Sequence, residues 1–224
     1  MLLRFRRLVP AALALAVAML LAPRSRAKDD KGFVMPKAAG AKTYPAHDTS
    51  EKEKVTIAVD PYDLPGKTQG VFRIKYKEED LLPLLLIISN EGGQPIALTG
   101  MQVELVTRRR VKIQPATEDD IYRRIARQPL KGDQPSANPL PFPRKVKRSV
   151  KKEEQEEMQD SRFAAKAVEP RATQAGFLFF DVEGIADPLA GAHLYVSGLR
   201  NNQGQELIFF DISLDKYLER APVK

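Results

Sequence analysis

The chain has 224 residues, a formal net charge of +7 and no cysteine. Without cysteine it can form neither a disulfide framework nor a lipid-modified cysteine anchor, so its fold must rest on a hydrophobic core. Five arginines lie before residue 28, and their removal would lower the net charge from +7 to +2, which argues against nucleic-acid binding.

The N-terminus has the form of a signal peptide. The basic stretch MLLRFRR precedes the apolar run LVPAALALAVAMLLAP, which is short for a membrane span. Ser25 and Ala27 occupy the small-residue positions that a signal peptidase reads, so residues 1–27 are predicted to be cleaved after Ala27. The predicted localisation is therefore periplasmic or secreted. Arg24 and Arg26 place positive charge beyond the run, so an uncleaved inner-membrane anchor is the alternative.

Residues 28–53 have no hydrophobic period and are predicted to be a disordered leader. The first part of a β-rich domain is predicted over residues 54–127. Alternation of apolar and polar residues in VTIAVD and in GVFRIKY, residues 70–76, predicts two strands. The stretch LPLLLIISNEGGQPIALTGMQVELV predicts a hairpin that turns at the Gly-Gly pair, with a bulge near Thr99 where the apolar positions change phase.

A short helix is predicted next, over EDDIYRRIARQ. Thr117 and Asp120 form a capping box, and Ile121 and Ile125 form its inward pair. Residues 128–170 are predicted to be an insertion, in which a proline-rich linker precedes a charged helix. The lysine and glutamate pairs of this helix predict a solvated surface, and a partner-binding helix is the alternative.

Residues 171–218 are predicted to form a three-stranded meander that completes the domain, followed by a tail at residues 219–224. FLFFDVEG and LIFFDISL share the letters FFD. Between them, AHLYVSGL has alternating apolar and polar residues, and RNNQGQ predicts a turn. Asp181 and Asp211 therefore mark the points where two core strands leave the hydrophobic layer. A catalytic pair of acids is not predicted, because no further polar residue completes such a site.

No catalytic, cofactor or metal site is predicted. His47 falls in the leader and His193 on a strand, and neither has other ligands at a metal-binding spacing. The sequence also has no cysteine nucleophile, no G-x-S-x-G elbow and no phosphate-binding glycine loop. We therefore expect a protein that is not an enzyme and needs no cofactor.

About seven short strands with turns between them predict an all-β protein with one short helix. The stretches LLPLLLIISNEGGQPIALTGMQVEL, AGFLFFDVEG and GAHLYVSGLRNNQGQELIFFDISL resemble the immunoglobulin-like domains of exported bacterial proteins, in which an apolar strand ends in an Asn-containing turn. The resemblance extends from Val55 to Leu218 apart from the insertion, and it implies an immunoglobulin-like antiparallel β-sandwich. The chain departs from the antibody type in having neither a cysteine pair nor tryptophan.

Four aromatic residues fall on the strand face opposite the one assigned to the core. They are Phe177, Phe179, Tyr195 and Phe209. Either the insertion or the other sheet buries this second face, or the residues form an exposed aromatic patch for a partner. They are the candidate interaction surface.

Two functions remain open at this point. The first is an exported, non-enzymatic binding or structural module of the bacterial cell envelope, which acts on another envelope protein through an aromatic or edge-strand surface. The alternative is a small exported hydrolase or ligand-binding protein whose site is assembled from loops. Contact with a membrane is expected only through an uncleaved signal segment.

Overall fold

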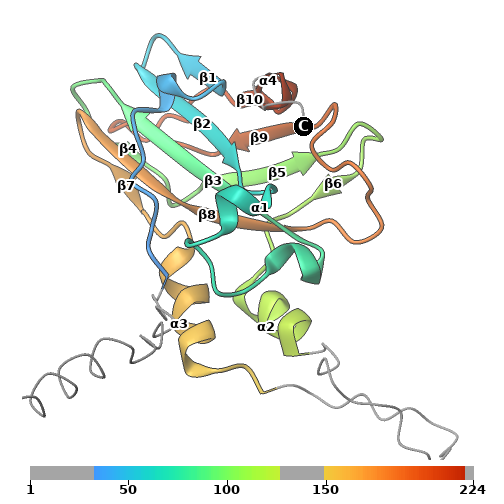
Figure 1. Cartoon of the computed structure of the whole chain (residues 1–224). Coiled ribbons are helices and arrows are strands. Elements are labelled where there is room, and N and C mark those ends of the chain that lie inside the picture. Colours follow the sequence, from blue (N-terminus) through green and yellow to red (C-terminus); the bar gives the residue numbers. More distant parts are fainter. Residues whose placement is uncertain (1–32, 127–148, 220–224) are drawn as a thin grey trace, which may run out of the picture. The chain divides into compact units, whose positions relative to one another are not determined.

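Two antiparallel four-stranded β-sheets form the framework of the described chain (Figure 1). A computed structural model describes residues 33–126 and 149–219, which belong to one compact unit. Sheet 1 has the strand order β1-β2-β3-β8, formed by Ala46–Ser50, Val55–Pro61, Leu81–Asn90 and Ala172–Asp181. Sheet 2 has the order β10-β9-β5-β6, formed by Phe210–Ser213, His193–Ser197, Gln102–Val106 and Lys112–Ile113. A separate pair joins β4, Ile96–Ala97, to β7, Ala167–Val168.

Short helices precede, connect or follow these strands. They are α1 (Pro65–Thr68), α2 (Glu118–Ala126), α3 (Lys152–Ser161), α4 (Asp215–Leu218) and the 3-10 turns η2 (Ala41–Thr43) and η3 (Tyr76–Glu79). The predicted helix after Thr117 is confirmed as α2: the Thr117 hydroxyl donates to Asp120 (2.6 Å), and Ile121 and Ile125 are fully buried. The prediction of a mostly β, antiparallel structure with few helices is likewise confirmed.

Strand β3 contributes to two hydrophobic cores. All ten of its residues are buried, because it lies between β2 and β8 and is covered on both faces. Leu84 and Leu86 belong to one core, whereas Leu85 and Ile87, at the alternate positions, belong to the other. An unbroken apolar run is the sequence pattern that burial on both faces requires.

The first core lies between the two sheets. It receives Ile57 and Leu86 from sheet 1 and Leu105, Val196 and Ile212 from sheet 2, all essentially inaccessible to solvent. The two sheets therefore pack face to face through the alternate apolar side chains of their strands.

The second core lies on the opposite face of sheet 1 and is rich in aromatic rings. Phe177 and Phe179 of β8 project into it, where Phe72 packs against Phe177 with 4.8 Å between ring centroids. α2 and α3 contribute Ile121 and Met158, and the two helices lie side by side in Figure 1. This helical and loop layer gives sheet 1 a covered second face.

Other segments of the same chain cover part of the outer edges of both sheets. The backbone N–H of Asp211 in β10 donates to the Asp48 carboxylate of β1 (3.0 Å), so β1 also contacts the edge of sheet 2. On the other side, the Ala116 N–H donates to the carbonyl of Phe179 in β8 (2.7 Å). Backbone groups that are already bonded cannot pair with a strand of another molecule.

The predicted C-terminal meander of three strands is wrong. β9 and β10 do pair antiparallel, with Leu194 opposite Ile212, but β8 pairs with β3 in the other sheet, with Phe177 opposite Leu85. A strand that is apolar on both faces is stable only where both faces are covered, and β8 meets that condition beside β3.

The predicted hairpin around the Gly-Gly pair is also wrong. β3 pairs with β2 and β8, whereas β4 pairs with β7, and β5 joins sheet 2. The change of phase that predicted a bulge at Thr99 is a turn instead, in which the Met101 N–H donates to the Leu98 carbonyl (2.9 Å). The chain passes there from the β4–β7 pair to sheet 2.

Residues 70–76 do not form the predicted strand. They form bends that lead into η3, and Phe72, Ile74 and Tyr76 still direct their side chains into the second core. The alternation in the sequence therefore reports burial of alternate side chains without strand pairing.

Two further predictions need correction. The leader was predicted to be disordered, but β1 pairs along its whole length with β2, from Ala46 opposite Val59 to Ser50 opposite Val55. The charged helix was predicted to be solvated, but α3 buries Glu157 and Met158 on one side. The predicted signal peptide, the proline-rich linker and all but the first residue of the predicted tail lie outside the described residues.

Candidate functional site

The structure separates the four aromatic residues that the sequence grouped together. Phe177 and Phe179 are 0% and 1% exposed in the second core, so they cannot contact a partner. Tyr195 and Phe209 lie together on the outer face of sheet 2, with 6.3 Å between their ring centroids. The predicted second face is therefore buried on β8 and open on β9 and β10.

Ile208 and Phe209, which directly precede β10, are large apolar side chains that are 79% and 59% exposed. β10 pairs with β9 from Phe210 onward. Three residues earlier, Leu207 bonds to the segment that follows β9, because its N–H donates to the Leu199 carbonyl (2.8 Å). Both Ile208 and Phe209 lie between these two contacts. We call Tyr195, Ile208 and Phe209 the apolar patch.

A polar pair borders the apolar patch. The His193 Nδ1 lies 2.6 Å from a carboxylate oxygen of Asp211, and the His193 ring stacks near Tyr195 with 6.1 Å between centroids. The pair lies at the patch margin, where a polar rim is usual for a protein interface.

The two aspartates of the repeated FFD motif lie on different sheets. Asp181, at the end of β8, is paired with Arg124 of α2, which also contacts Glu183 (2.9 Å). Asp211 interacts with His193 in sheet 2. The structure does not bring Asp181 and Asp211 together at one site.

His47 and His193 likewise occupy separate positions. His47 Nδ1 lies 2.6 Å from the Tyr44 carbonyl, on β1, whereas His193 is on β9. Within residues 33–126 and 149–219, no group of three or more His, Asp or Glu side chains is placed to hold a metal ion.

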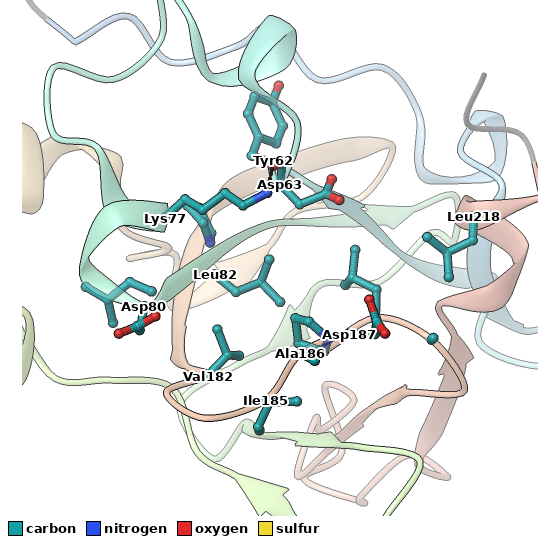
Figure 2. A pocket seen from close by; sticks show the side chains of 15 residues that line it. Tyr62, Asp63, Lys77, Asp80, Leu82, Val182, Ile185, Ala186, Asp187 and Leu218 are labelled. Atoms are coloured by element: carbon teal, nitrogen blue, oxygen red, sulfur yellow. Dashed lines mark hydrogen bonds between the residues drawn. The ribbon is translucent and has the colours of Figure 1, made fainter. Parts of the chain in front are cut away.

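A cleft lies at the end of sheet 1 where β2 and β8 end and β3 begins. It consists of two pockets, of about 380 and about 660 Å³, which share Tyr62, Asp63, Lys77 and Pro83 as a common wall. Figure 2 shows the first pocket, with Leu82 and other apolar side chains inside it and charged side chains at its margin.

Not every charged side chain that lines the first pocket forms an ion pair with another described residue. The Lys77 ammonium donates to the Asp63 carbonyl (3.3 Å), and it forms no ion pair with another described residue. Asp80 and Asp187 also line this pocket, as Figure 2 shows. A cleft with an apolar interior and a few polar groups at its margin is the usual form of a small-molecule site.

Lys67 of α1 contacts an aspartate and two tyrosine rings beside the cleft. Lys67 forms an ion pair with Asp60, and its ammonium lies 4.7 Å from the centroid of Tyr62 and 4.9 Å from that of Tyr217. Burial raises the pKa of Tyr62 to about 12 and raises the pKa of Tyr217, whose hydroxyl donates to Asp63 (3.0 Å). Both phenols therefore stay neutral near pH 7 and present ring faces to the cation.

Sequence reasoning missed Ile208 and the cleft. Ile208 alternates with Phe210 and Ile212 in LIFFDISL, a spacing that is typical of one strand face, but regular pairing with β9 begins only at Phe210. Gly198, opposite this interruption, has φ +79° and was the one local signal of it. The cleft carries no local motif, because its walls come from segments about 100 residues apart.

None of the helices that the structure describes is long and apolar enough to cross a membrane. No protein-family model and no curated protein matches the chain. A solved structure of a Bacillus subtilis protein (ycdA), provisionally assigned as a lipoprotein, is similar with a TM-score of 0.35 and 13% identity. The similarity covers 80% of this chain, which spans 40% of that protein. Values this low assign neither fold nor function.

Proposed function

We propose that this protein is an exported, non-enzymatic, immunoglobulin-like module of the bacterial cell envelope that binds another protein through the apolar patch. The exposure of the consecutive residues Ile208 and Phe209, at 79% and 59%, is the observation that carries the proposal. Adjacent apolar side chains of this size are costly to leave in water and are typical of the centre of an interface.

The strand order supports the immunoglobulin-like part of the proposal. In the immunoglobulin lettering, strands A, B and E form one sheet with D, and G, F and C form the other, extended by C′ in variable domains. With β1 set aside, β2-β3-β8 takes the places of A-B-E, and β10-β9-β5-β6 takes those of G-F-C-C′. The D position has no equivalent in sheet 1, because β7 pairs with β4.

The N-terminal segment supports export. Its basic stretch and short apolar run, followed by Ser25 and Ala27, are typical of a cleaved signal peptide. The proposed location is therefore the periplasm or the exterior, with anchoring in the inner membrane as the alternative.

We expect the double substitution Ile208→Ser, Phe209→Ser to weaken binding of the partner at least about tenfold, because loss of a buried apolar anchor commonly costs more than about 1.4 kcal/mol. The partner is captured from envelope extract on the chain from Lys28, purified, and titrated by calorimetry against parent and variant. Fold stability is expected to change little, since both side chains are exposed.

The matched control is Val111→Ser, which alters an apolar side chain that is 50% exposed outside the patch. It should bind the purified partner as the parent does. Equal affinity of the double variant and the parent would contradict the proposal, as would a loss of binding in the Val111 variant of the same size.

A second candidate function is binding of a small ligand in the cleft at the end of sheet 1. The two pockets, of about 380 and about 660 Å³, fall in the size range of ligand sites and share a wall that contains the Lys77 ammonium. An apolar interior with a few polar groups at its margin is the arrangement of a ligand-binding site.

A fragment screen by NMR tests this second function. Fragments that bind should shift the amide signals of Lys77 and Ala186 together, and Ala186→Trp should abolish the shifts by filling the exposed mouth of the first pocket. Ala39→Trp, at an exposed position that does not line either pocket, is the control. Shifts that persist in the Ala186 variant would exclude the first pocket as the site.

A further inference from the structure

Three consecutive arginines lie in the turn that joins β5 to β6. Arg108, Arg109 and Arg110 are exposed, and none of them forms an ion pair with another described residue. The next cation along the chain, Lys112, is by contrast paired with a glutamate of β5 (3.1 Å). Residues 107–111, which we call the basic turn, therefore carry three positive charges without an acidic partner.

Hydrogen bonds fix the backbone of the basic turn. The Arg110 N–H donates to the Thr107 carbonyl (2.8 Å), and the Thr107 N–H donates to the Val111 carbonyl (2.9 Å). The Thr107 hydroxyl also accepts a bond from the Val111 N–H (3.2 Å). A turn whose backbone is already fixed loses little conformational entropy when its side chains bind a partner.

An apolar side chain stands next to these charges. Val111 is 50% exposed at the end of the same turn. An anionic membrane surface suits this combination, because guanidinium groups pair with lipid phosphates while an adjacent apolar side chain enters the interfacial region. A nucleic acid suits it less well, since residues 107–112 include no aromatic side chain on which a base could stack.

We propose that the basic turn binds the surface of a membrane that contains anionic phospholipids. This contact goes beyond the proposed function, because it concerns a surface separate from the apolar patch. It also goes beyond the sequence-based expectation, in which only an uncleaved signal segment contacts a membrane.

The basic turn and the exposed pair of the apolar patch lie toward opposite ends of β9. Val106, which precedes the turn, lies opposite His193 at the beginning of β9. Phe210, which follows the exposed pair, lies opposite Val196 near the end of β9. Figure 1 shows the turn beyond the ends of β5 and β6. A membrane bound at the turn therefore leaves Ile208 and Phe209 free for a partner protein.

The three charges set the expected strength of binding and its dependence on salt. A basic side chain near an anionic leaflet raises affinity about fivefold, so three of them raise it about a hundredfold. Salt weakens this attraction, because the screening length falls from about 10 Å at 0.1 M to about 3 Å at 1 M.

Sedimentation with lipid vesicles tests the proposal. The chain from Lys28, which omits the apolar N-terminal run, is mixed with vesicles of phosphatidylcholine, either alone or with about one third phosphatidylglycerol. At low salt the parent should bind the anionic vesicles at least about tenfold more tightly than the neutral ones, and it should dissociate from them near 1 M salt. Equal binding to both kinds of vesicle would overturn the proposal.

Two variants with the same net charge locate the contact. The first replaces all three arginines of the basic turn with glutamine and should bind the anionic vesicles about a hundredfold more weakly. The control, Lys166→Gln, Arg171→Gln, Arg200→Gln, removes three other exposed cations and should weaken binding no more than about threefold. All six side chains are exposed, so both variants should remain folded, as circular dichroism can check. Equal losses in the two variants would overturn the proposal.

Val111→Ser distinguishes a membrane from a soluble anion as the partner. It should weaken binding to the anionic vesicles about threefold, because only a bilayer accepts the apolar side chain. The double substitution Ile208→Ser, Phe209→Ser should leave vesicle binding unchanged. Full binding by the Val111 variant, or competition by inorganic polyphosphate at equal ionic strength that abolishes binding, would overturn the membrane as the partner.

Discussion

Substitution of Phe177 by alanine should lower the free energy of unfolding by about 3–5 kcal/mol, which is the range for a buried phenylalanine whose loss leaves a cavity. Phe177 is fully buried on β8, and its ring lies 4.9 Å from that of Tyr62 and 4.8 Å from that of Phe72, in edge-on contact with both. These contacts join sheet 1 to the loop layer. The loss should be measured by urea denaturation of the chain from Lys28.

Phe209→Ala is the matched control for this prediction. Phe209 follows the same pattern in the sequence but is 59% exposed, so its removal should change the unfolding free energy by no more than about 0.5 kcal/mol. Similar losses in the two variants would contradict the separation of the aromatic residues into a core and a surface patch.

Gly198→Ala should destabilise the fold by about 2–6 kcal/mol, through two additive causes. Gly198 has φ +79°, where an L side chain is strained, at a cost of about 1–3 kcal/mol. An added Cβ would also lie 2.0 Å from the Gly100 carbonyl oxygen, so the backbone at Gly100 would have to move, which costs about 1–3 kcal/mol more. This close approach joins the end of β9 to the turn before β5.

Gly204→Ala isolates the backbone cost. Gly204 has φ +76°, but no atom lies within 4 Å of its added Cβ, so only the strain of about 1–3 kcal/mol remains. Chemical denaturation of both variants should show the larger loss at Gly198. Equal losses would mean that the contact with Gly100 contributes nothing to stability.

Local patterns predicted local structure correctly where the deciding contacts are also local. α2 is an example, because its capping box spans Thr117 to Asp120 and its buried pair, Ile121 and Ile125, follows within two turns. The apolar letters of β3 also predicted a strand, which the structure confirms, although the strand pairs with β2 and β8 instead of forming the predicted hairpin.

Patterns failed where a distant segment decides the outcome. β8 and β10 share the letters FFD, but β8 pairs with β3, whose residues lie more than 80 positions earlier. The alternation in residues 70–76 predicted a strand, whereas Glu157, on a helix that was predicted to be solvated, accepts the backbone bonds of this segment. The cleft could not be predicted for the same reason, because its walls come from loops that meet only in the folded chain.

We propose that this protein meets its partner at the outer face of sheet 2, at Phe209. Site-specific photo-crosslinking in intact cells tests it most directly, with a benzophenone side chain placed at position 209 in one strain and at position 111 in another. Both positions are exposed. We predict one discrete crosslinked adduct from position 209, which is lost when Ile208 is also changed to serine, and none from position 111. No adduct from position 209, or the same adduct from both positions, would contradict the claim.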